Sequence, residues 1–120
     1  MKRTTLKRNT PLKRGGMLRR TGQLPATSKK RRAALPNRAA CRETVLIRDS
    51  YRCQAASLVP EVTCSGQLDV HEIIPRSVWP DGWLVADNCV TVCRGHHTWI
   101  GFNPTAAAEL GLHKFSWDRP

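Results

Sequence analysis

The first 40 residues of this 120-residue chain contain no aspartate and no glutamate, although they hold 13 of its 20 lysines and arginines. The rest of the chain therefore carries 7 basic groups against all 9 acidic ones, a net charge of −2 within a total of +11. This distribution excludes a uniformly basic protein. It predicts a basic arm, residues 1–36, joined to a near-neutral domain, residues 37–120.

Long apolar runs are also missing. No stretch approaches the roughly 18 consecutive apolar residues of a membrane helix, and no apolar run follows the basic start as it would in a secretory signal. We therefore expect no membrane partner and a cytoplasmic location, although an organelle transit peptide has a similar arginine-rich, acid-free composition. In a reducing compartment, five cysteines favour metal ligands or free thiols over a disulfide framework.

The arm repeats a leucine every six residues, at Leu6, Leu12, Leu18 and Leu24. Six positions rotate a helix by about 240°, so these leucines would share a face only in an extended chain. We expect the arm to be disordered alone and to lie extended on nucleic acid, with DNA as the partner. The candidate phosphate contacts in this region are Lys7, Arg8, Lys13, Arg14, Arg19, Arg20, Lys29, Lys30, Arg31 and Arg32.

The domain has the pattern of a small α+β fold. Asn37 is a candidate N-cap, β-branched residues indicate strands, and Asn103-Pro104 before an alanine run indicates a helix start that Gly111 would end. The expected elements are a helix over about 38–50, a strand over 68–74, a strand over 89–93, and helices over 94–100 and 104–110.

Three cysteines and a histidine have the chemistry of a structural zinc site. Thiolate and imidazole are the preferred ligands of tetrahedral zinc. A domain of this size has a small hydrophobic core, so a structural metal ion would add to its stability. The alternative is ordinary buried thiols and a surface histidine. Cys41 and Cys89 have no paired spacing, so we interpret them as a helix-face and a core residue. The candidate zinc ligands are Cys53, Cys64, Cys93 and His96.

A second cluster consists of His71, Glu72, Asn88 and His97, at the ends of the two expected strands and on the following helix. A hairpin followed by a helix can bring these side chains around one divalent cation. Imidazole and carboxylate can bind such an ion, and a positioned base can activate water beside it. Phosphodiester hydrolysis uses both devices.

These segments resemble the HNH endonuclease family, whose domains have a ββα-metal (His-Me finger) fold. The resemblance rests on Val70-His71-Glu72-Ile73-Ile74-Pro75-Arg76-Ser77, on Asp87-Asn88-Cys89-Val90-Thr91-Val92-Cys93 and on Arg94-Gly95-His96-His97. The offset of nine residues from Asn88 to His97 also matches the family. The arm is similar to those of small phage members. The resemblance thus implies a cytoplasmic location in a bacterial host, a role in phage DNA processing or packaging, and the phage terminase as a partner.

The resemblance also implies roles for individual residues. His71 and His97 would bind the catalytic cation, Mg²⁺, Mn²⁺ or Ni²⁺, and Asn88 would orient the base or help hold the metal site. His96 would take the place of the fourth zinc-binding cysteine of the family.

Glu72 departs from the family, which usually has its general base, a histidine, at this position. Three interpretations stay open: Glu72 is the base, His71 takes that role, or activity is weak. The competing functions are a metal-dependent endonuclease cleaving one or both DNA strands, a non-catalytic zinc module that binds nucleic acid, and a basic RNA-binding protein.

Other side chains have less specific interpretations. Arg76 and Arg94 flank the second cluster and are candidates to clamp phosphate, with surface solubility as the alternative. The tryptophans are expected to pack the small domain more often than to stack on bases, and His113 has no assigned partner. The tryptophans are Trp79, Trp83, Trp99 and Trp117.

Overall fold

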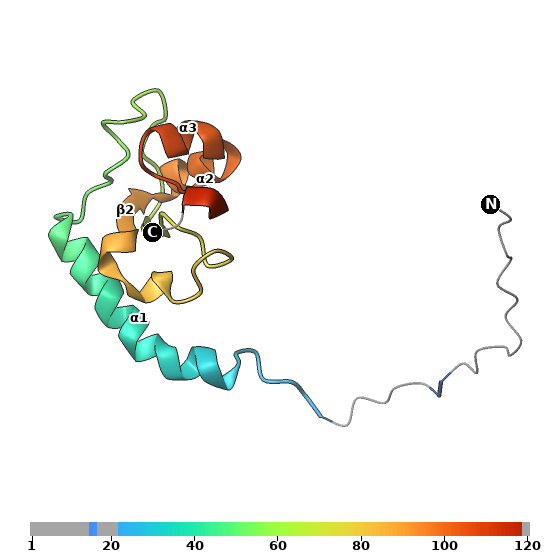
Figure 1. Ribbon diagram of the computed structural model, residues 1–120. Helices are drawn as coiled ribbons and strands as arrows, with labels where there is room; N and C mark the ends of the chain where they lie inside the picture. The colour runs from blue at the N-terminus through green and yellow to red at the C-terminus, as the bar shows by residue number, and fades with distance from the viewer. Residues whose placement is uncertain (1–14, 17–21, 119–120) are drawn as a thin grey trace, which may run out of the picture.

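The computed structural model describes residues 15–16 and 22–118 (Figure 1). Most of the leucine repeat, with candidate contacts Lys7 to Arg14, Arg19 and Arg20, lies outside these residues. The elements in chain order are α1 (Lys29–Arg48), β1 (Leu68–Glu72), the 3₁₀ turns η1 (Gly82–Leu84) and η2 (Ala86–Asn88), β2 (Cys89–Cys93), α2 (Arg94–Phe102), α3 (Pro104–Glu109) and the 3₁₀ turn η3 (Ser116–Asp118).

Helix α1 begins earlier than the sequence analysis predicts. Its N-cap is Ser28, whose side chain accepts a hydrogen bond from the backbone N–H of Arg31 at 3.2 Å, so the prediction of Asn37 as the cap is wrong. The helix continues through Pro36, which the predicted boundary places outside it. As a consequence Lys29 to Arg32 form the first turn of a helix and are not part of an extended arm.

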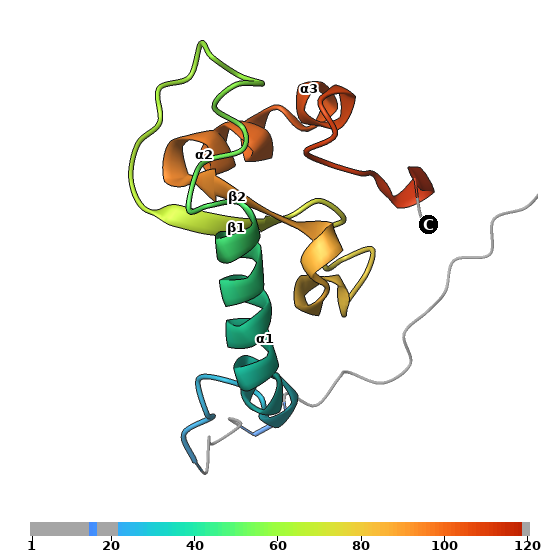
Figure 2. The ribbon, with the colours of Figure 1, turned by 90° about the vertical axis from the view of Figure 1, so that its left-hand side faces the viewer.

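Two antiparallel strands form the sheet, with Val70 opposite Thr91 and His71 opposite Val90. Because successive side chains alternate between faces, this register separates Val70 and Cys89 from His71. The first two pack against Val45 of α1 in one core cluster. His71 is therefore on the opposite face, the one that α2 covers (Figure 2).

Strand β1 ends two residues sooner than predicted. The backbone N–H of Ile73 still reaches the carbonyl of Asn88, but the N–H of Ile74 bonds to the side chain of Asn88 instead of to a strand. The backbone pairing of the strands thus ends at the point where the Asn88 side chain accepts the N–H of Ile74, just before Pro75.

Helices α2 and α3 agree closely with prediction. Ile100 of α2 packs with Val92 and Ala107 in the second core cluster, which closes the domain on the side away from α1. Asn103 lies at the start of α3, but its side chain donates to the carbonyl of Trp99 at 2.9 Å and so caps α2. Gly111, with φ +76°, provides the left-handed turn after α3.

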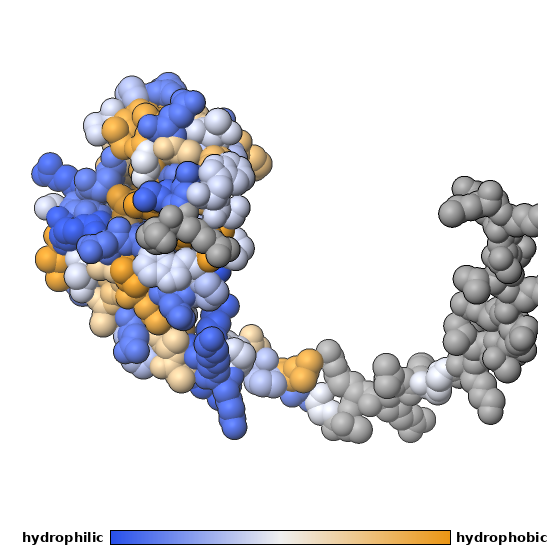
Figure 3. Space-filling model, viewed as in Figure 1, coloured by the Kyte–Doolittle hydropathy of each residue, from blue (hydrophilic) through white to orange (hydrophobic). Residues whose placement is uncertain are grey.

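The face of the molecule drawn in Figure 3 has small hydrophobic areas interspersed with hydrophilic ones. No helix within residues 22–118 is long and apolar enough to cross a membrane.

Candidate metal centre and histidine cavity

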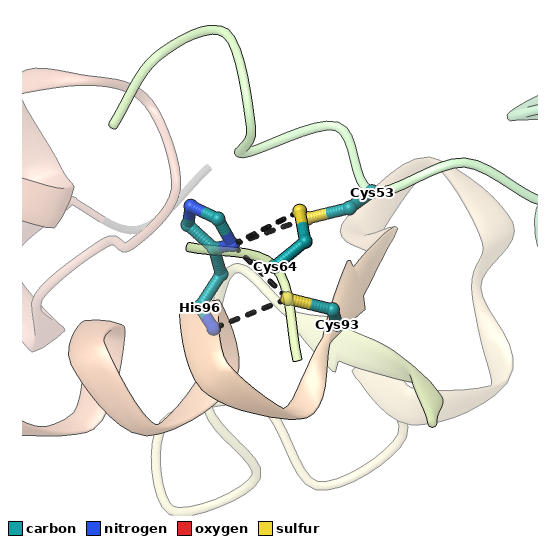
Figure 4. Close-up of side chains that lie close together, drawn as sticks. All are labelled: Cys53, Cys64, Cys93 and His96. Carbon is teal, nitrogen blue, oxygen red and sulfur yellow. Dashed lines mark hydrogen bonds between the residues drawn. The ribbon is translucent and has the colours of Figure 1, made fainter. Parts of the chain in front are cut away.

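The four predicted zinc ligands come together, although they belong to different parts of the fold (Figure 4). Cys53 lies just after α1, Cys64 in the loop before β1, Cys93 at the end of β2 and His96 in the first turn of α2. Their ligand atoms all lie within 4.8 Å of one another. The Nδ1 atom of His96 is 3.0 Å from Sγ of Cys93 and 3.6 Å from the other two sulfurs.

The local backbone explains how this cluster forms. Cys93 ends the strand and is also the N-cap of α2, where its sulfur accepts from the N–H of His96. The loop carrying Cys64 packs directly on that helix start, because the N–H of Gly95 donates to the Ser65 carbonyl. A Cβ atom at Gly95 would lie 2.5 Å from the Ser65 hydroxyl and 3.2 Å from the carbonyl of Thr63, so a larger residue would force the hydroxyl to rotate and the loop to shift.

The protonation states also suit a cation. The Nε2–H of His96 donates to the carbonyl of Val59 at 3.1 Å, which leaves Nδ1 as the free ligand atom. Burial opposes ionisation of Cys93, but hydrogen bonds, first among them the one from the backbone N–H of His96, outweigh it and lower the pKa of Cys93 to about 6. Desolvation and the neighbouring thiols raise the pKa of Cys64 to about 11.

A divalent cation would offset the repulsion between these thiolates. The cluster is therefore a Cys3His group compatible with structural zinc. Cys89 and Cys41 are buried in the α1 core cluster, at 1% and 7% exposure, as the sequence analysis predicts for Cys89.

On the other face of the sheet, His71 and His97 meet at a cavity of about 220 Å³. Their ring centroids are 5.2 Å apart in an edge-on arrangement. His113, to which the sequence analysis assigns no partner, also lines this cavity, together with Glu72 and residues of α2 and α3.

His71 is the buried member of the pair, with 9% exposure. Its Nε2–H donates to the carbonyl of Leu112 at 2.7 Å, so Nδ1 is the ring atom left free. Burial lowers the pKa of His71, although the bond to Leu112 acts in the opposite direction. Its ring is therefore neutral near pH 7.

His97 is held by a carboxylate that the sequence analysis missed. Its Nδ1–H donates to Oδ2 of Asp69 at 3.0 Å, and this bond fixes the ring with Nε2 free. Asp69 lies two residues before His71 and so shares its face of β1. That i, i+2 spacing on a strand is a signal that could have identified it.

The carboxylate of Glu72 bonds arginine side chains and neither of the two histidines. It accepts three hydrogen bonds from Arg76, at 2.8 to 3.2 Å, and lies 4.0 Å from the guanidinium of Arg38 on α1. Both arginines also lie over the ring of Trp83. Glu72 thus borders the cavity with His71 and His97, but its carboxylate is engaged by Arg76 and Arg38.

Asn88 is buried, with 5% exposure, and its amide is fully used by the backbone. It accepts from the N–H of Ile74 at 2.8 Å and donates to the carbonyls of Ile74 and Gly82 at 3.1 and 3.2 Å. Asn88 therefore fastens the loop between β1 and η1, which carries Arg76, to the start of β2.

The two candidate phosphate clamps both have internal partners. Arg76 bonds Glu72, and Arg94 pairs with Asp69 at 3.0 Å. Both side chains still reach solvent, with 48% and 56% exposure. Neither lines the cavity, but a carboxylate of β1 links each to a residue that does: Glu72 itself for Arg76, and His97 through Asp69 for Arg94.

Comparison of the chain with models of protein families, with curated proteins and with solved structures finds no match. The geometry of the metal centre and of the histidine cavity therefore has to carry the functional argument.

Proposed function

We propose that the chain is a divalent-cation-dependent endonuclease of the HNH type that hydrolyses phosphodiester bonds in DNA. The observation that carries the proposal is the meeting of His71 and His97 at one cavity. A strand, a second strand and a helix bring them there, and the Cys3His cluster ties the end of β2 to the start of α2. A zinc module that only binds nucleic acid does not need a pair of histidines outside its zinc site.

The free ring nitrogen of His97 suits a divalent cation. His97 presents Nε2 while Asp69 holds its other ring nitrogen, an arrangement typical of metal-binding histidines. Such a cation, Mg²⁺, Mn²⁺ or Ni²⁺, would stabilise negative charge on the phosphoryl and leaving oxygens.

The side-chain contacts favour His71 over Glu72 as the general base. His71 is oriented by the Leu112 carbonyl, has one free nitrogen, and has a lowered pKa that keeps it able to accept a proton from water at neutral pH. Glu72 instead neutralises Arg76 and Arg38. We infer that it positions these arginines and takes no proton.

A pair of substitutions tests this assignment. Because a general base contributes roughly 10²- to 10⁴-fold to the rate, His71→Ala should reduce plasmid cleavage by at least about 100-fold. Glu72→Gln keeps an acceptor for Arg76 and should reduce cleavage less than about tenfold. The reverse order of the two effects would assign the base to Glu72.

The second candidate is a non-catalytic zinc module that binds nucleic acid. It is favoured by the ion pairs of Glu72, since the family usually has its base at this position. The two functions differ in one assay: incubation of supercoiled plasmid with the wild-type protein and Mg²⁺, Mn²⁺ or Ni²⁺. The endonuclease yields nicked or linear plasmid, whereas the binding module retards plasmid without cutting it.

A further inference from the structure

Three aromatic rings near the C-terminus form a continuous ladder, His113, Phe115 and Trp117. The rings of Phe115 and Trp117 are stacked, with centroids 4.7 Å apart and planes 15° from parallel. The ring of His113 meets Phe115 edge-on at 4.8 Å. The ladder therefore extends from one side chain of the histidine cavity.

The outer ring does not pack into the domain. Trp117 is 77% exposed, so the expectation that the tryptophans serve packing is wrong for this residue, while it holds for Trp83 at 9% exposure. A tryptophan left in water forgoes a large gain from burial. Its exposed face is thus available to another flat ring.

The ladder is anchored to the body of the protein. The N–H of Lys114 donates to the carbonyl of Ile73 at the end of β1, and the N–H of Phe115 donates to the carboxylate of Asp118. Figure 2 shows η3, which carries Trp117, at the periphery, beyond the loop that leads away from α3. The rings are therefore held in place beside the cavity and directed outwards.

We infer that this ladder stacks the unpaired bases of a nucleic-acid strand whose phosphate occupies the histidine cavity. Bases in an uninterrupted duplex are stacked on one another, so their faces cannot reach Trp117. Aromatic stacking on splayed bases is the usual way in which proteins hold single strands. The inference rests on the proposed function and deepens it, because it names the substrate class as DNA with an unpaired segment, such as a single strand, a gap or a branch.

The charge of the chain favours a nucleic-acid strand over an apolar segment of a partner protein as the ligand of the ladder. The 13 basic groups of the first 40 residues attract a polyanion to the chain, whereas an apolar peptide gains nothing from them. Beside the ladder itself, the cation Lys114 is offset by Asp118, whose carboxylate accepts from the N–H of Phe115, so the arm supplies the electrostatic attraction and the rings supply the stacking.

Binding in the absence of divalent cation tests the inference without cleavage. Fluorescence anisotropy compares a labelled single strand with the duplex of the same sequence, for the wild type, Trp117→Ala and Phe102→Ala. Phe102 is the matched control, since it is 82% exposed and outside the ladder. Both positions are on the surface, and equal zinc content and melting temperature show that the variants fold.

Trp117→Ala should weaken single-strand binding by about tenfold, since base stacking on an aromatic ring contributes on that order. Trp117→Ala should weaken duplex binding by less than about twofold. Phe102→Ala should leave the affinities for single strand and duplex unchanged. Trp117→Phe should keep most of the wild-type affinity for the single strand. Equal weakening on both ligands, or no weakening, would overturn the inference, and the latter result would point to a protein occupant.

A cleavage assay separates this inference from the proposed function. With divalent cation, a gapped or branched duplex should be cut faster than the intact duplex, and Trp117→Ala should remove the difference. Cleavage without such a preference would overturn the inference and leave the nuclease proposal standing. If the wild-type protein binds single strands through Trp117 but cuts no DNA, the nuclease proposal is overturned and the binding of unpaired bases by the ladder stands.

Discussion

At the scale of single residues, Asp69 connects the features around the cavity. It fixes the ring of His97 at 3.0 Å and also pairs with Arg94, while it shares a strand face with His71. Carboxylates in this position set the tautomer of a metal-binding histidine and raise its basicity. Asp69 is therefore a positioning residue of the proposed site.

Asp69→Asn should reduce the affinity for the divalent cation, and with it the cleavage rate at low cation concentration, by about 10- to 100-fold. Removal of the ion pair with Arg94, which is largely exposed, should matter little. Titration of the rate with Mn²⁺ measures the effect, with Glu109→Gln on the exposed side of α3 as the control. An unchanged cation dependence would show that Asp69 has no such role.

Residue patterns predicted some of these interactions and not others. The spacing of Cys93 and His96 is local, and it identified half of the Cys3His cluster. The meeting of Asp69 with His97, 28 residues apart, and of His71 with Leu112, 41 apart, depends on how the helices cover the sheet. Nothing in the sequence around Trp117 indicated that it would remain exposed.

At the scale of elements, Asp49 joins the end of α1 to the sheet. Its carboxylate accepts from the N–H of Thr91 on β2 at 2.9 Å and pairs with Arg48 at 2.8 Å. Burial opposes the charged form of Asp49, but the bonds from Arg48 and Thr91 outweigh it and lower its pKa below 3.8. The charged carboxylate thus helps to hold α1 against the strand, in addition to the packing of Val45 on Val70 and Cys89.

This lowered pKa gives a stability effect with a definite sign. A carboxyl whose pKa is lower in the folded state stabilises the protein above its unfolded pKa and loses that effect as the pH falls through the folded value. Asp49→Asn should therefore cost about 2 kcal/mol near pH 7 and progressively less below about pH 4.

Denaturant unfolding of the wild type and Asp49→Asn across this pH range measures the effect. Because acid would also release a metal ion held by the Cys3His cluster of both proteins, the difference between their free energies of unfolding is the relevant quantity. A difference that stays constant with pH would contradict the role of the charged carboxylate.

The start of α1 was the element least predictable from sequence. Pro36 is normally unfavourable inside a helix, so the pattern favoured a start after it, at Asn37. The helix tolerates this proline and begins at the Ser28 cap, which places the basic cluster of residues 29–32 on a fixed surface. The two strands and the two later helices have clear turn and capping residues, and they were predicted within a few residues.

At the scale of the whole molecule, the Cys3His cluster with zinc bound should hold the fold together. Cys93→Ser should lose the zinc ion and lower the melting temperature by more than about 10 °C, since a structural zinc site contributes many kcal/mol. Cys41→Ser is the matched control, because Cys41 is buried but outside the cluster. Elemental analysis showing equal zinc in both variants would refute the centre.

The charge division makes a separate prediction about the arm. Deleting residues 1–21 removes eight basic groups while it keeps Ser28 and α1 intact. The slope of log affinity against log salt on duplex DNA should then fall by up to about 7, at roughly 0.9 for each phosphate that the shortened chain no longer neutralises. An unchanged slope would show that the arm does not lie on phosphates.

The most direct test of the central claim is the rate at which supercoiled plasmid is converted to nicked or linear forms by the wild type and by His97→Ala, purified identically, in Mg²⁺, Mn²⁺ and Ni²⁺. The endonuclease proposal predicts cleavage by the wild type and a rate at least about 100-fold lower in the variant, with zinc content and DNA affinity unchanged. No cleavage by the wild type with any of the three cations, or equal cleavage by both proteins, would contradict it.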